Sequence, residues 1–125
     1  MPNRFIKPEG LSNNPAYTHV VAASGGTTVY ISGQVAVDAS GATVGSGDLE
    51  AQTRQVMENL KVALAAAGAT FDDVVKITTY VVGYEPAMRA VIAGVRGAYL
   101  SGDNPPASTL VGVQALAAPE WLIEI

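Results

Sequence analysis

The stretch QTRQVMENLKVALAAAGATFDDVVKITTYV, residues 52–81, carries a helix pattern followed directly by a strand pattern. Over Leu49–Ala67, apolar residues recur at intervals of three and four, which is typical of an amphipathic helix. Asp48 suits the positive start of this helix, and Gly68 suits its end. The run VVKITTYVV at residues 74–82 is rich in β-branched residues and almost uncharged, which predicts a central strand of a sheet.

Further strands and a second helix are predicted on both sides of this stretch. Before it, a turn at Gly25-Gly26 joins two strands, and the second strand continues beyond Gly33. After it, Pro86 suits the first turn of a second helix with one apolar stripe. The predicted order β-β-β-α-β-α-β-β indicates an α+β fold with two helices on one face of a mixed sheet. These flanking segments are residues 4–6, 16–38, 86–99, 107–116 and 120–125.

The composition indicates one domain, residues 1–125, whose surface is partly covered by other copies of the chain. Of the 125 residues, 49% are hydrophobic and only 14% are charged, compared with about 25% charged in an average soluble domain. So few charged side chains leave apolar surface exposed, and large apolar patches mark interfaces. No predicted element is left to cover the second face of the sheet, which also favours a homo-oligomer. The alternative is a monomer with a surface rich in alanine and glycine.

Charge and motifs argue against several classes of function. The net charge is −4 and the seven basic residues are scattered, which disfavours nucleic acid as a partner. One chain offers no cysteine and only one histidine, His19, so we expect no metal site, although a trimer would gather three copies of His19. The Gly-rich segment SGGTT matches no phosphate or dinucleotide motif, and we expect no cofactor. Without a long apolar run or a signal-peptide pattern, we expect no membrane partner and a cytoplasmic location.

Two features of the C-terminal part carry polar chemistry. NPPASTLV, residues 104–111, begins a strand with the hydroxyls of Ser108 and Thr109 and no charge. Ser108 would be a nucleophile only with a base beside it, and the sequence has no nucleophile-elbow motif. Glu124 lies in the apolar strand WLIEI, either at a solvated edge or partly buried. Burial would raise the pKa of its carboxyl and suit it to proton transfer.

Three segments are similar to the RidA/YjgF family of reactive-intermediate deaminases: YISGQVAVD, residues 52–81, and PPASTLVGVQALAAPEWLIEI. The resemblance runs from about Tyr17 to the last residue. It implies a chorismate mutase-like α+β fold, with a mixed six-stranded sheet and two helices on one face. It also implies a homotrimer whose sheets cover one another, with ligand clefts between neighbouring subunits. The implied activity is hydrolysis of enamines and imines, such as 2-aminoacrylate, to a 2-oxo acid and ammonia, without metal or cofactor.

The resemblance also implies which residues line the cleft. Tyr17 matches an early cleft tyrosine, and Ser32 matches the serine of an S-G-Q motif. Glu124 matches the carboxylate that orients or activates water. Thr109 is expected in the same cleft, and His19 stands where glutamine is common.

Two positions depart from the family pattern. The arginine that grips the substrate carboxylate directly follows Pro-Ala in the family, but Ser108 stands there in this chain. Ala93 aligns where deaminases often carry asparagine. Losing the two hydrogen bonds of an arginine fork weakens binding of the transition state on the order of 10²-fold. Arg89 and Arg96, seven residues apart on the second helix, are predicted to face solvent, with rescue by a neighbouring subunit as the open alternative.

The resulting hypothesis is a RidA-like homotrimer that binds a small, uncharged or weakly anionic molecule between subunits. It would hydrolyse an imine, an enamine or a similar C–N bond, with weak activity on 2-iminopropanoate because Ser108 replaces the arginine. Glu124 and Ser108 are the expected catalytic residues. The alternative is a non-catalytic trimer that binds a metabolite or regulates a partner. The net negative charge of the chain gives little support to an endoribonuclease activity, because RNA is a polyanion.

Overall fold

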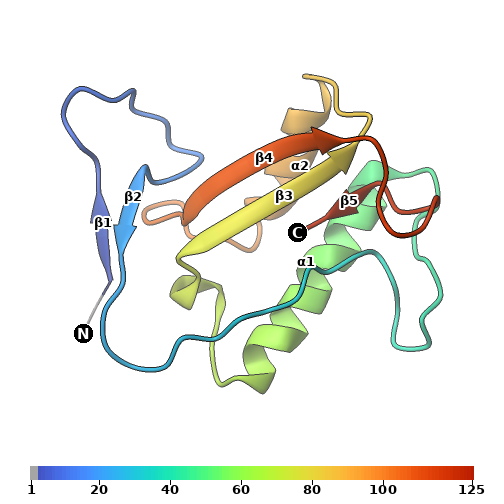
Figure 1. Ribbon diagram of the computed structural model, residues 1–125, viewed down its shortest axis with the longest axis horizontal. Coiled ribbons are helices and arrows are strands. Elements are labelled where there is room, and N and C mark those ends of the chain that lie inside the picture. Colours follow the sequence, from blue (N-terminus) through green and yellow to red (C-terminus); the bar gives the residue numbers. More distant parts are fainter. Residues whose placement is uncertain (1–2) are drawn as a thin grey trace.

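The computed structural model describes residues 3–125, where two α-helices and five strands form an α+β arrangement (Figure 1). The sequence predicted this class. It also predicted the central strand and both helices within a few residues of their ends. The elements are β1 (Arg4–Ile6), β2 (Val20–Ala22), α1 (Leu49–Ala66), a 3-10 turn (Phe71–Asp73), β3 (Lys76–Val82), α2 (Met88–Arg96), β4 (Ala107–Val113) and β5 (Ile123–Glu124).

The strands form two separate sheets. β3 lies in the middle of a three-stranded mixed sheet of order β4-β3-β5, parallel to β4 and antiparallel to β5. β1 and β2 pair with each other as an antiparallel two-stranded sheet, which lies beside the larger one (Figure 1). The central position of β3 agrees with its almost uncharged, β-branched sequence, because both of its edges are paired.

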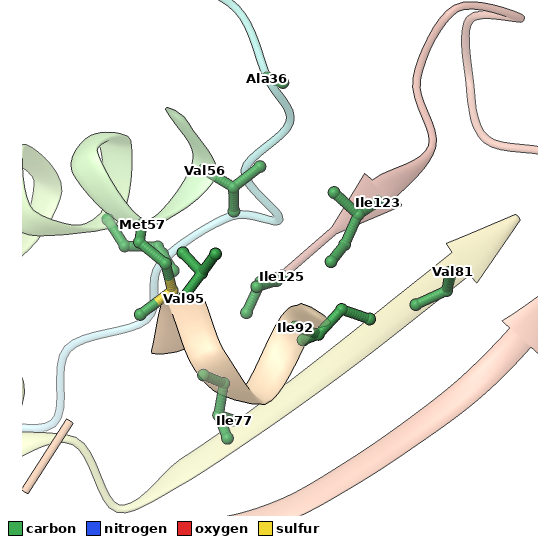
Figure 2. Packing of buried hydrophobic residues seen from close by; sticks show 10 residues of the cluster. Ala36, Val56, Met57, Ile77, Val81, Ile92, Val95, Ile123 and Ile125 are labelled. Atoms are coloured by element: carbon green, nitrogen blue, oxygen red, sulfur yellow. The ribbon is translucent and has the colours of Figure 1, made fainter. Parts of the chain in front are cut away.

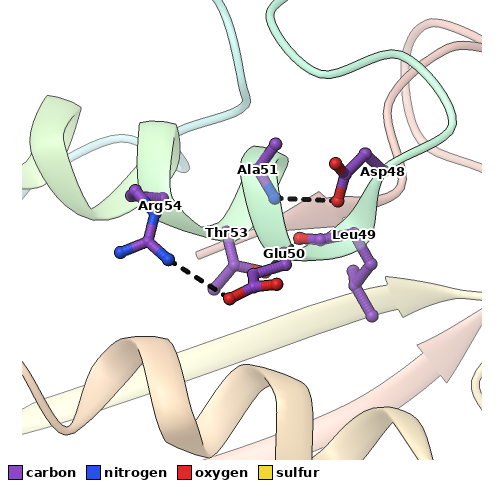
Figure 3. A network of polar contacts seen from close by, with 6 residues as sticks. All are labelled: Asp48, Leu49, Glu50, Ala51, Thr53 and Arg54. Atoms are coloured by element: carbon purple, nitrogen blue, oxygen red, sulfur yellow. Dashed lines mark hydrogen bonds and ion pairs between the residues drawn. The ribbon is translucent and has the colours of Figure 1, made fainter.

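Helix α1 begins and ends where the sequence predicted. The Asp48 carboxylate accepts a hydrogen bond of 3.1 Å from the Ala51 N–H, so it caps the first turn (Figure 3). One turn on, Arg54 pairs with Glu50 at 3.2 Å, an exposed contact that contributes about 0.3–0.5 kcal/mol (Figure 3). Gly68 follows the helix with φ of 74°, a conformation that favours glycine.

Both helices cover the same face of the larger sheet. Alternate β3 residues Ile77, Thr79 and Val81 are buried under the helices, whereas Tyr80 between them is 38% exposed. Figure 2 shows side chains from the sheet and from both helices meeting in one cluster. On the opposite face, which we call the open face, no helix of the described residues lies over the sheet. The cluster comprises Ala36, Val56, Met57, Leu60, Ile77, Val81, Ile92, Val95, Ile123 and Ile125.

A single six-stranded sheet is not found among the described residues. The expected strand around Gly33 is an extended segment that forms no ladder. Its Gln34 exchanges two backbone hydrogen bonds with Ile125, of 2.8 and 3.1 Å, beside the very short β5. Val29 and Tyr30 in this segment are 45% and 92% exposed. The segment therefore meets the sheet at Gln34 only. Ala36 is buried in the core, but Val29 and Tyr30 are left largely uncovered by the described part of the chain.

Gln52 falls off the apolar stripe of α1, where a polar side chain is expected to face solvent. It is fully buried on α1, where its side-chain oxygen accepts from the Leu122 N–H at 2.9 Å. Its side-chain nitrogen donates to the carbonyl oxygens of Glu120 at 2.8 Å and Gly45 at 3.3 Å. Every polar group of the amide is thus occupied, which allows a polar residue to lie in the core. These bonds tie α1 to the loop that leads into β5.

Candidate functional site

A cavity of about 440 Å³ lies between helix α2, the loop that precedes β2 and the start of β4. Tyr17 lines it from the loop, Ser108 lines it from β4, and Arg96 lines it from α2. Ala93 and Gly97 of α2 also form part of the wall, and their small side chains leave room. The volume lies in the range of small-molecule sites.

The strand register places Ser108 in this cavity. Ser108 pairs with Ile77 of β3, which is buried under the helices. Because directly paired residues point to the same side of a sheet, the Ser108 side chain also lies on the helix-covered face.

Thr18 holds Tyr17 close to the start of β4. The Thr18 hydroxyl donates to the Pro105 carbonyl oxygen at 2.5 Å, and its backbone N–H donates to the Pro106 carbonyl oxygen at 3.2 Å. Thr18 is almost fully buried, so these bonds are shielded from water. Sequence analysis missed this residue. Its only signal is a hydroxyl within a predicted strand.

Arg96 was wrongly predicted to face solvent, and it is largely buried in the wall of the cavity. Its Nη2 donates to the Ser108 Oγ at 3.5 Å, and its Nε is buried without a hydrogen-bond partner in the described chain. Burial lowers the pKa of Arg96. Arg89 is exposed, as predicted, and lines the same cavity. The error arose because Arg96 ends α2 where the start of β4 passes beside it, and no helical pattern reports that neighbour.

Glu124 and Thr109 lie on the open face of the sheet, opposite to Ser108. Glu124 pairs with the half-exposed Tyr80, and Thr109 pairs with Thr78 on the same side. The Thr109 hydroxyl accepts a hydrogen bond of 2.6 Å from the Lys76 ammonium. Within one chain, the two expected catalytic residues, Glu124 and Ser108, are therefore on different faces.

Glu124 is half-buried and packs against Gly33 in the extended segment. A Cβ added to Gly33 would collide with the Glu124 carboxylate, so the contact requires glycine. Ser32, the residue before Gly33, is exposed, and its carbonyl oxygen accepts from the Gln34 side chain at 3.1 Å. Of these two residues, Gly33 is the one that contacts Glu124.

His19 lines a second cavity, of about 230 Å³, that it shares with Tyr17. Its Nε2 lies 2.7 Å from the Ser12 carbonyl oxygen, so this nitrogen carries a hydrogen. The imidazole contacts the Tyr17 ring edge-on, with 5.1 Å between the ring centroids. His19 therefore adjoins the larger cavity through Tyr17. The structure brings Tyr17 and Ser108 together and leaves Ser32, Thr109 and Glu124 apart from them, and the roles of all six residues stay predictions.

Within residues 3–125, no three His, Asp or Glu side chains are grouped so that they could hold a metal ion. Over the same residues, neither helix is long and apolar enough to cross a bilayer.

Known proteins resemble this chain over most of its length. Residues 10–125 match the family described as Endoribonuclease L-PSP. A solved structure of YyfB, a Rid family protein from Yersinia pestis, is 48% identical, with a TM-score of 0.93 over 99% of this chain and 95% of that one. RidA from Psychrobacter sp. PAMC 21119 is 35% identical, with a TM-score of 0.69 over 82% of this chain and 79% of that one. A RutC family protein from Pyrococcus horikoshii is 36% identical over 83% of this chain and 79% of its own length.

Proposed function

Since the chain belongs to the RidA/YjgF family, we propose that it is a homotrimer that binds a small molecule in clefts between subunits and hydrolyses an imine, an enamine or a similar C–N bond. The observation that carries this proposal is the cavity in which Tyr17 and Ser108, far apart in the sequence, lie on either side of one small-molecule volume. Hydroxyl groups in a mostly apolar pocket fix the orientation of a ligand.

The open face supports the assembly. Tyr80 and Val111 pair with each other across β3 and β4 there, and both are more than a third exposed. Tyr30 in the nearby extended segment is also exposed. Apolar side chains on an uncovered sheet favour packing against another copy, and a closed ring of three leaves no such face uncovered.

A site shared between two subunits would bring the Ser108 hydroxyl and the Glu124 carboxylate together. The described residues that line the cavity include no aspartate, glutamate or histidine, so one chain provides no base beside Ser108. In the trimer, Glu124 of one subunit would face the cavity of its neighbour. Its carboxylate would take a proton from water as the water adds to the C=N carbon, and would return that proton to the departing nitrogen. The balance is an imine plus water giving a carbonyl compound plus ammonia.

The test is the rate at which imines disappear when an amino-acid oxidase forms them in solution. We expect the protein to accelerate hydrolysis of at least one imine. Because general acid–base catalysis contributes about 10²–10⁴-fold, we expect Glu124→Gln to lose most of that acceleration. Glu120→Gln is the matched control, because Glu120 is an exposed carboxylate four residues away. Full activity in Glu124→Gln would contradict the proposed role of this residue.

The alternative is a non-catalytic trimer that binds a metabolite or regulates a partner. The described lining of the cavity has no carboxylate or imidazole. If Glu124 does not reach the cavity of a neighbouring subunit, this lack favours the non-catalytic function. Binding of a ligand without acceleration of any imine hydrolysis would support the non-catalytic function. Cleavage of RNA has less support, because a net charge of −4 repels a polyanion.

A further inference from the structure

The guanidinium of Arg96 is a largely buried charge without a counter-ion among the described residues. In residues 3–125 the one ion pair joins Arg54 to Glu50, and no carboxylate contacts Arg96. Its buried Nε has no hydrogen-bond partner there, and its Nη2 makes only a 3.5 Å contact with the Ser108 Oγ, at the outer limit of a hydrogen bond. Buried charges are normally paired, because an unpaired one loses its hydration without compensation.

The surroundings of Arg96 select for a negative group. Ile92, Leu110 and Pro105 form an apolar wall, where attraction between opposite charges is stronger than in water. Arg89 adds a second positive charge to the same cavity. No acidic side chain lines the cavity in the described part of the chain, so nothing there competes with an incoming anion.

The contact between Arg96 and Ser108 also leaves the Ser108 hydroxyl able to donate a hydrogen bond to a ligand. The Ser108 Oγ accepts from the Arg96 guanidinium, which leaves the hydroxyl hydrogen free to donate elsewhere. A serine at this position is short enough to leave the guanidinium exposed to the cavity, whereas a long side chain would fill that space.

We propose that Arg96 is the anion-binding residue of this cavity and that the ligand is a small monoanion, held by the guanidinium of Arg96 and the hydroxyl of Ser108. This inference rests on the proposed function, because it assumes that the cavity is the ligand site. It replaces the sequence-based expectation of an uncharged or weakly anionic ligand. Arg96 thus determines the class of ligand, and Arg89, which is exposed, contributes only long-range attraction that salt screens.

The experiment compares pyruvate with pyruvamide, which has a similar size and no charge, by calorimetric titration of the full chain. We expect the wild-type protein to bind pyruvate at least about 10-fold more tightly than pyruvamide, since hydrogen bonds to charged groups are the stronger ones. Arg96→Gln should weaken pyruvate binding about 10- to 100-fold and leave pyruvamide binding unchanged. Arg54→Gln, the matched control, removes an exposed arginine that does not line the cavity, and it should change either affinity less than about threefold at 0.15 M salt.

Arg96→Lys guards against a loss of folding, because it keeps the charge but not the planar fork, and it should bind pyruvate with an affinity between those of wild type and Arg96→Gln. Equal binding of the two ligands by the wild-type protein would overturn the role of Arg96 and leave the proposed function standing. Equal loss of both ligands in a folded Arg96→Gln would also overturn it, because the residue would then shape the cavity without selecting charge. Binding of neither ligand by the wild type would overturn both proposals.

Discussion

The two faces of the larger sheet differ in how much of each face a single chain covers. The helix-covered face has a packed core, a buried glutamine with every polar group bonded, and a cavity with its own charged residue. The open face has exposed Tyr80 and Val111 and the half-buried Glu124, and the extended segment beside it leaves Val29 and Tyr30 exposed. One face has its own packed core and the proposed binding groups, and the other presents the candidate base and an uncovered surface. We infer that the site needs both faces and therefore two chains.

The largest expected effect belongs to the core of the helix-covered face. Met57→Ala should lower the free energy of unfolding by about 2–5 kcal/mol, because it leaves a cavity where the side chain is fully buried. Val62→Ala on the same helix is the control, since Val62 is 71% exposed, and it should change stability by less than about 0.5 kcal/mol. Denaturation in urea measures both. A small effect of Met57→Ala would mean that the helix-covered face is not packed as described.

A charge on the open face should disrupt assembly and leave the fold of the chain intact. Val111→Asp would bury an unpaired carboxylate in the proposed interface, which costs several kcal/mol or forces the subunits apart. We expect light scattering to show smaller particles with unchanged circular dichroism. Val62→Asp, an equal change on the exposed side of α1, should leave the particle size as in the wild type. An unaltered assembly in Val111→Asp would show that the open face is not the interface.

The smallest expected effect concerns the contact between the extended segment and Glu124. Gly33→Ala must displace the Glu124 carboxylate, which costs less than about 1 kcal/mol because the carboxylate ends a flexible, half-buried side chain that can turn aside. Gly94→Ala is the control, because nothing lies within 4 Å of an added Cβ there and alanine suits a helix better by up to about 1 kcal/mol. Thermal unfolding compares the two. Equal stability of the two variants would mean that Glu124 is free to move away from Gly33.

Local patterns predicted the regular elements well. The spacing of Val56, Met57, Leu60 and Leu64 and the cap at Asp48 depend only on neighbours within a few positions, so the amino-acid sequence alone locates α1. The almost uncharged, β-branched composition of β3 likewise indicated that both of its edges are paired. Helices on one side of the sheet followed from the order of the elements.

Contacts between distant segments could not be predicted in this way. Arg96 meets Ser108 only because α2 ends beside the start of β4, and Gln52 is buried only because the chain before β5 offers the groups that it bonds. Residues 27–36 have the composition of a strand, but a strand needs a neighbour along its whole length. Within the described chain these residues make backbone hydrogen bonds only at Gln34, with Ile125, and at Ala36, with Val44. A sequence pattern shows which element a segment can form, but a strand forms only where another segment pairs with it.

The most direct test of a site shared between chains mixes two variants, Glu124→Gln and Arg96→Gln, each with low activity by itself. The two proteins are dissociated together and reassembled, and mass spectrometry verifies the mixed trimers. If Glu124 of one subunit serves the cavity of the next, about a quarter of the sites in a random mixture unite both wild-type residues, and imine hydrolysis should recover to that fraction. No recovery in verified mixed trimers, or a wild-type particle of only 12.8 kDa in light scattering, would contradict the shared site.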